Sequence, residues 1–73
     1  MIKPDSRRLL STVGKFTIST LRPFDHPQSW ETCLFSPDDS EVVAVYVNWN
    51  DAINGHNSVV TTMQFMNREI NNV

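Results

Sequence analysis

The spacing of apolar residues along the chain changes near residue 48. Before that point, short segments rich in β-branched residues alternate apolar with polar positions or run continuously apolar, and proline, glycine and aspartate separate them. After it, apolar residues recur at steps of three and four. Alternation is typical of β-strands, and the longer step is typical of an amphipathic helix. The pattern therefore predicts strands over residues 15–22, 30–35 and 41–47, followed by a helix over residues 49–67.

The two connections between these strands are short. Residues 23–29 contain Pro23 and Pro27, which lack backbone donors and force a loop. The segment SPDDSE, between the second and third strands, concentrates turn-forming residues. Because short connections favour antiparallel neighbours, we expect a three-stranded antiparallel β-meander.

The predicted helix has one apolar stripe and a clear start. Asn48 is a good N-cap, and Asp51 stands where a carboxylate meets the free amides of the first turn. Gly55 costs a helix about 1 kcal/mol relative to alanine, so we expect another group to approach the backbone closely there. The stripe consists of Ala52, Ile53, His56, Val59, Val60, Met63 and Met66. Packed flat on one face of the meander, it would form the second layer of the core.

The first fourteen residues carry a weaker signal. Pro4 and Gly14 stand where a short helix would begin and end, with apolar residues between them at helical spacing. We expect a basic N-terminal arm or short helix over residues 1–14, a single α+β domain over residues 15–67 and a polar tail over residues 68–73. The predicted fold class is α+β, a meander packed on one face by a C-terminal helix.

Composition indicates a small cytosolic protein. A chain of 73 residues with 40% hydrophobic residues can fold, although its core must be small. Its one cysteine, Cys33, excludes an intramolecular disulfide and favours a reducing compartment, and we interpret it as a small core residue. No apolar run approaches the roughly 18 residues of a membrane span, so we expect a soluble protein without membrane contacts.

Charge is divided unevenly along the chain. Residues 1–22 carry five cations and one acid, whereas residues 23–73 carry one cation and seven acids. The basic segment and the acidic segment either pair with each other or bind different partner surfaces. Dispersed cations beside an acidic body make a poor footprint for phosphates, so direct nucleic-acid binding is not expected. The candidate partner-binding residues are the cations Lys3, Arg7 and Arg8 and the acidic turn Asp38, Asp39 and Glu41.

His56 poses the main chemical question, because it lies in the middle of the apolar stripe. Either it acts as a base or metal ligand, or it is a neutral core histidine with hydrogen-bonded ring nitrogens, and we expect the second. His26 and Asp25 in the proline-flanked loop, with Glu31 beyond, would complete a metal site with His56 if the loop reached the helix. Nothing in the spacing enforces that site. No nucleophile motif, phosphate-binding loop or zinc-finger spacing is present, so we expect no catalytic residue, bound metal or cofactor.

Three fragments read together resemble a known group of proteins. ISTLRPFDH, WETCLF and WNDAINGHNSVV follow the order of an S-T-V/L strand, a D-H pair, an E-T-M-x-F strand and a W-x-x-A-x-x-G-H helix start. This order is similar to that in a widespread group of small uncharacterised tailed-phage proteins, over roughly residues 16–60. Cys33 stands where the group tends to have methionine, and the loop from Asp25 to Glu31 is shorter than usual there.

The resemblance implies a phage gene product acting in the cytoplasm of an infected bacterium, and it brings no activity. It also fits a structural polar network of Asp25, His26, Glu31 and His56 that fixes the loop on the helix start. We therefore expect a non-enzymatic protein of host takeover that binds a host protein complex and modulates or inhibits it. Host RNA polymerase, and thus transcription regulation, is the first choice, and a CRISPR or other defence complex is the second. The alternative is a metal- or nucleotide-dependent activity centred on the same four residues.

Overall fold

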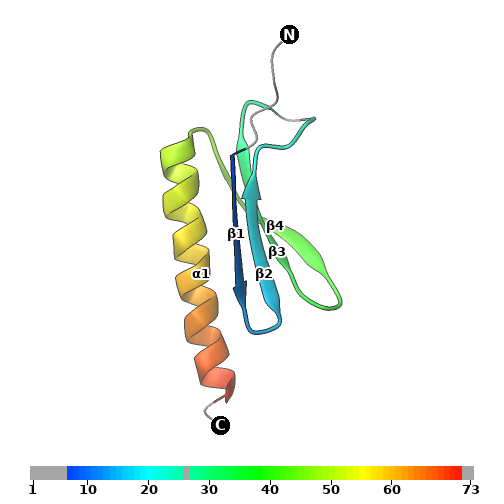
Figure 1. Ribbon diagram of the computed structural model, residues 1–73, viewed down its shortest axis with the longest axis vertical. Coiled ribbons are helices and arrows are strands. Elements are labelled where there is room, and N and C mark those ends of the chain that lie inside the picture. Colours follow the sequence, from blue (N-terminus) through cyan, green and yellow to red (C-terminus); the bar gives the residue numbers. More distant parts are fainter. Residues whose placement is uncertain (1–6, 26, 72–73) are drawn as a thin grey trace.

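A computed structural model describes residues 7–25 and 27–71 of the chain. Four strands precede one helix: β1 (Arg8–Val13), β2 (Phe16–Leu21), β3 (Trp30–Phe35), β4 (Ser40–Tyr46) and α1 (Trp49–Asn71). The strands form one antiparallel sheet in the order β1-β2-β3-β4, and the helix packs along one face of it (Figure 1). The predicted α+β class, antiparallel sheet and C-terminal helix are confirmed. The predicted number of strands is wrong, because the sheet has four rather than three.

The additional strand is β1, which falls within the predicted N-terminal arm. Gly14, with a φ of 58°, is the first residue of a two-residue connection in which Val13 pairs with Phe16. A glycine with positive φ at this position matches a type II′ hairpin turn, which folds a strand back rather than ending a helix. Arg8 pairs with Leu21 at the far end of the ladder. Of the predicted arm, residues 1–6 lie outside the described residues.

Strand alternation gives the sheet two different faces. Toward α1 it presents Trp30, Thr32 and Ile18, all with at most 1% of their surface exposed. On the other face, the register aligns residues from all four strands in successive rows. These rows are Arg8, Leu21, Glu31 and Val45; Leu10, Ser19, Cys33 and Val42; and Thr12, Thr17, Phe35 and Ser40. We call this the open face, because α1 covers only the opposite one.

The helix begins where the sequence predicts and ends later. Asp51 donates its backbone N–H to Asn48 Oδ1 at 2.8 Å, and Asn48 Nδ2 donates to the Asp51 carboxylate at 3.0 Å. This reciprocal cap fixes the first turn. The predicted end at residue 67 is wrong by four residues, since α1 continues to Asn71. No proline or glycine follows Gly55 to stop it.

The apolar stripe of α1 matches the length of the sheet. Ala52, His56 and Met63 are buried, and Val59 and Val60 are partly buried against the core. Met66, predicted as the end of the stripe, is 49% exposed. A six-residue strand is about 20 Å long and a 23-residue helix about 35 Å, so the last turns of α1 extend past the sheet. In the described part of the chain, no helix is long and apolar enough to cross a membrane.

Candidate functional site

The most polar part of the core is a hydrogen-bonded network around His56, whose side chain is 2% exposed. Its Nε2 lies 2.9 Å from Ser11 Oγ on β1, and its Nδ1 lies 2.7 Å from Thr20 Oγ1 on β2. Thr20 Oγ1 in turn lies 2.6 Å from Thr32 Oγ1 on β3. Thr20 and Thr32 are both completely buried. The imidazole therefore joins α1 directly to β1 and β2, and Thr20 extends the network to β3.

Every described partner of the imidazole is an uncharged hydroxyl. In the neutral ring, one nitrogen donates and the other accepts, and either tautomer suits this chain because each hydroxyl can donate or accept. Burial lowers the pKa of His56, since removal from water disfavours the charged form. The ring is therefore a neutral member of the core.

The Ser11–His56–Thr20 arrangement has the order of a nucleophile, a base and an orienting group. Such an order is the geometric signature of nucleophilic catalysis. Here, however, the third member is a hydroxyl, which cannot stabilise an imidazolium as a carboxylate does. The ring is also shut between the helix and the sheet, where a substrate cannot reach it. The arrangement holds β1, β2 and α1 in register through the two hydrogen bonds of the ring.

Of the predicted polar network of Asp25, His26, Glu31 and His56, the described members Asp25 and Glu31 do not hydrogen-bond to the buried ring, whose partners are Ser11 and Thr20. Glu31 follows Trp30 in β3 and so projects from the open face, whereas His56 lies under the opposite face. Asp25 is exposed in the loop between β2 and β3. His26 lies outside the described residues. Strand alternation is thus the reason that Glu31 and His56 are separated by the sheet.

The residue pattern alone predicts only some of the side chains that surround His56. Thr20 and Thr32 fall on the inward face of their strands by simple alternation, and a buried threonine opposite another threonine is a sign of a cross-strand hydrogen bond. Ser11 carries no such signal, because the apolar residues around it also fit helical spacing. A hydrogen-bonded network of residues from three strands can be predicted only when the order of the strands in the sheet is known.

Acidic and sulfur groups on the open face do not make a metal centre. Cys33 is partly buried, and burial, with the neighbouring Glu31 carboxylate, raises the pKa of its thiol. A thiol so shifted is a poor nucleophile and a poor ligand at neutral pH. Among residues 7–25 and 27–71, no three histidine, cysteine, aspartate or glutamate side chains lie together in a way that could hold a metal ion.

An aromatic cluster joins the start of α1 to the sheet. The rings of Trp30 and Trp49 lie 4.6 Å apart between centroids. The Arg7 guanidinium lies 5.2 Å from the centroid of Trp30 and 4.9 Å from that of Trp49, and the Arg22 guanidinium lies 5.3 Å from Trp30. Cations over aromatic faces at this range are attracted by the ring quadrupole. Arg7, a candidate partner contact, thus also stabilises the fold.

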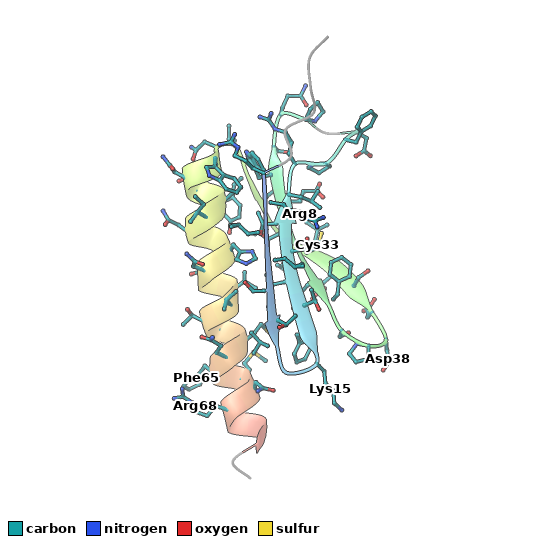
Figure 2. All side chains as sticks on the ribbon, in the orientation of Figure 1. Arg8, Lys15, Cys33, Asp38, Phe65 and Arg68 are labelled. Atoms are coloured by element: carbon teal, nitrogen blue, oxygen red, sulfur yellow. The ribbon has the colours of Figure 1, made fainter. Side chains whose placement is uncertain are left out.

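The other candidate partner contacts lie at opposite ends of the sheet. Arg8 begins β1, whereas Asp38 and Asp39 lie in the turn between β3 and β4, and Glu41 follows on β4. Figure 2 shows Arg8 well separated from Asp38. Lys3 lies outside the described residues. The candidate cation Arg8 and the acidic turn therefore lie on two surfaces rather than one.

Apolar side chains are exposed mainly on the open face and along β4. The open face carries Leu10, Phe35, Val42 and Val45, with exposed fractions of 42% to 61%. Val43 and Val47 are exposed in and just after β4. Exposed apolar residues that share one side of a small protein are typical of interaction surfaces.

Comparisons of the chain with protein-family models, with curated proteins and with solved structures gave no match.

Proposed function

We propose that this chain is a small phage protein that binds a host bacterial protein complex without catalysing a reaction, and so modulates or inhibits it. The observation that supports binding most directly is the uncovered sheet. One helix packs on one face, while Leu10, Phe35, Val42 and Val45 stay exposed on the other. An apolar surface of this kind gains free energy when a partner covers it.

The burial of His56 supports binding over catalysis. It is the residue best suited to acid–base chemistry in the described chain, and both of its ring nitrogens are hydrogen-bonded inside the core. The exposed side chains of the open face are apolar, hydroxyl-bearing or charged. Surfaces of that composition suit a protein partner better than a small substrate, which binds in a concave pocket.

The proposed setting and target follow from the resemblance to tailed-phage proteins. Host RNA polymerase is the first choice, and a CRISPR or other defence complex is the second. The acidic turn supports a target that normally binds nucleic acid, because Asp38, Asp39 and Glu41 are all exposed and can imitate phosphate charges. Arg8, exposed at the other end of the sheet, would meet an acidic surface.

The test is capture of partners from bacterial lysate by the full chain, followed by mass spectrometry and by direct binding to purified RNA polymerase. Asp38→Asn combined with Glu41→Gln should weaken capture, whereas Asp25→Asn, which neutralises an exposed acid in the other loop, should not. Recovery of no partner above background at several salt concentrations contradicts the proposal. Capture of a partner other than RNA polymerase would support the binding function but would change the proposed target.

A further inference from the structure

The charges of the open face and its rim are divided between the two lateral halves of the sheet. On the face itself, the register places two charged side chains, Arg8 at the start of β1 and Glu31 near the start of β3. At the other end of the strands, the turn between β1 and β2 carries Lys15, and the turn between β3 and β4 carries Asp38 and Asp39, all exposed. Figure 2 shows Lys15 and Asp38 at the same end of the sheet. The β1–β2 half is therefore basic and the β3–β4 half acidic.

Other charged residues near these strands lie off the open face. Arg7 and Arg22 lie over the ring of Trp30, which is buried on the side of α1. Glu41 pairs with Leu34, which packs against the core under the helix, so strand pairing directs Glu41 to the helix side as well. The division between a basic and an acidic half thus holds for the face that α1 leaves uncovered.

The apolar residues of the open face are placed so that the face can cover a copy of itself. About a twofold axis parallel to the strands, β1 of one copy lies over β4 of the other, and β2 lies over β3. Leu10 then meets Val42 of the second copy, because the two share one row of the sheet. Ser19 and Cys33, in the middle of the same row, are small enough to let the sheets approach to the usual spacing of about 10 Å.

The same axis brings opposite charges together at both ends of the strands. Arg8 of each copy would lie about one strand spacing, roughly 4.8 Å, to the side of Glu31 of the other, since both belong to one row. Lys15 of each copy would lie over the turn that holds Asp38 in the other. The loops between β2 and β3, each with an exposed Asp25, would lie side by side beyond the strands, where water and salt screen their repulsion.

A twofold axis across the strands would bring like charges together instead. Each half of the face would then cover the same half of the other copy, with Arg8 near Lys15 and Glu31 near Asp38. Facing like charges oppose association, so the charge pattern selects the axis parallel to the strands.

The size of the face indicates a weak dimer. Four strands about 4.8 Å apart and about 20 Å long give a footprint of roughly 400 Å² per copy. Stable complexes bury about 800 Å² per partner. We therefore expect a dissociation constant of about 10 to 100 μM, so the face becomes free again on dilution.

We propose that the open face binds a second copy of this chain, with the two sheets packed face to face about a twofold axis parallel to their strands. The dimer has four layers, and α1 of each copy lies on the outside because it packs on the opposite face of its own sheet (Figure 1). This inference goes beyond the proposed function and does not depend on it. A host protein that covers the open face would compete with the second copy.

The first experiment is sedimentation equilibrium of the full chain from about 5 μM to about 500 μM, a range in which such a dimer should form. Arg8→Glu and Glu31→Arg should each weaken self-association at least about tenfold, because each variant brings like charges together across the interface. Arg68→Glu provides the control, since Arg68 is exposed on α1, and it should associate as the parent chain does.

The second experiment mixes the two weakened variants in equal amounts. Arg8→Glu leaves two acids at these positions and Glu31→Arg leaves two bases, so one copy of each restores both opposite-charge contacts. The mixture should therefore dimerise with about the affinity of the parent chain. Disturbance of the fold within one variant could not be repaired by mixing, and melting temperatures of the separate variants check the fold directly.

Three results would overturn the proposal. These are a parent chain that stays monomeric throughout the range, a dimer that neither Arg8→Glu nor Glu31→Arg weakens, and two weakened variants that do not associate when mixed. Capture of host partners from lysate is scored separately. A monomeric chain that captures a host partner removes this inference and leaves the proposed function, whereas a dimer for which lysate yields no partner does the reverse.

Discussion

The phenol ring of Tyr46 occupies the space in which a β-carbon on residue 55 would lie. Tyr46 ends β4 and Gly55 lies in the second turn of α1, so this contact sets how closely the helix approaches the sheet. The cost of Gly55 to the helix predicts a close approach at this residue, and the structure confirms it. The approaching group is an aromatic ring rather than another backbone.

Replacement of Gly55 by alanine should destabilise the protein, although alanine is the better helix former. The methyl group would force the Tyr46 ring or the helix to move, at a cost of about 1 to 3 kcal/mol in the free energy of unfolding. Chemical denaturation measures it. In a Tyr46→Ala background, which removes the ring, Gly55→Ala should instead stabilise by up to about 1 kcal/mol. Equal effects in both backgrounds would show that the ring does not limit residue 55.

Replacement of His56 by alanine should lower the free energy of unfolding by about 1 to 3 kcal/mol, through the cavity and the hydrogen bonds left unpaired at Ser11 and Thr20. Thermal and urea denaturation with circular dichroism measure the change. Asn57, exposed one position along the helix, provides the control, and Asn57→Ala should have little effect. An unchanged melting temperature of the His56 variant would contradict a core role for the ring.

Stability should depend on pH through His56. The folded-state pKa lies below the unfolded value of about 6.5, so the unfolded chain binds more protons between the two values. The contribution of neutral His56 to the free energy of unfolding is therefore complete above about pH 6.5 and decreases as the pH falls toward the folded pKa. Urea denaturation at several pH values checks this, and the slope in this window should be smaller in His56→Gln. A parent chain that becomes more stable on acidification through this window would show the wrong sign.

Protein purified without a histidine tag should contain zinc, iron and manganese well below one equivalent. Glu31 and His56 lie on opposite sides of the sheet, and the imidazole nitrogens are already bonded to hydroxyl groups. Elemental analysis by mass spectrometry measures the content. A full equivalent of one metal would favour the alternative activity centred on Asp25, His26, Glu31 and His56.

Residue pattern predicts most of the fold, because most of it is specified locally. The three predicted strands and the start of α1 agree with the structure within one or two residues, since alternation and the Asn48 cap are local signals. The pattern does not predict β1, because Leu9, Leu10 and Val13 fit helical spacing as well as alternation. Only pairing with β2 decides between the two, and pairing is not local.

The candidate site was predictable to a smaller extent. That His56 lies in the core follows from its place on the helical stripe, whereas its partners depend on sheet order. Ser11 stands opposite Ile18 across β1 and β2, and the stripe of α1 crosses above them. A residue pair such as Glu31 and His56 can look complementary in sequence while strand alternation turns one of them to the other face.

The most direct test is an NMR titration of the His56 imidazole in the folded protein, by its ring carbon and nitrogen shifts. A ring enclosed between α1 and the sheet should stay neutral as the pH falls past about 6.5, with both nitrogens shifted by hydrogen bonds and slow proton exchange. A ring that titrates near pH 6.5 with the shifts of a free imidazole would place His56 in water, and neither its core role nor the packing of the helix on the sheet would then stand.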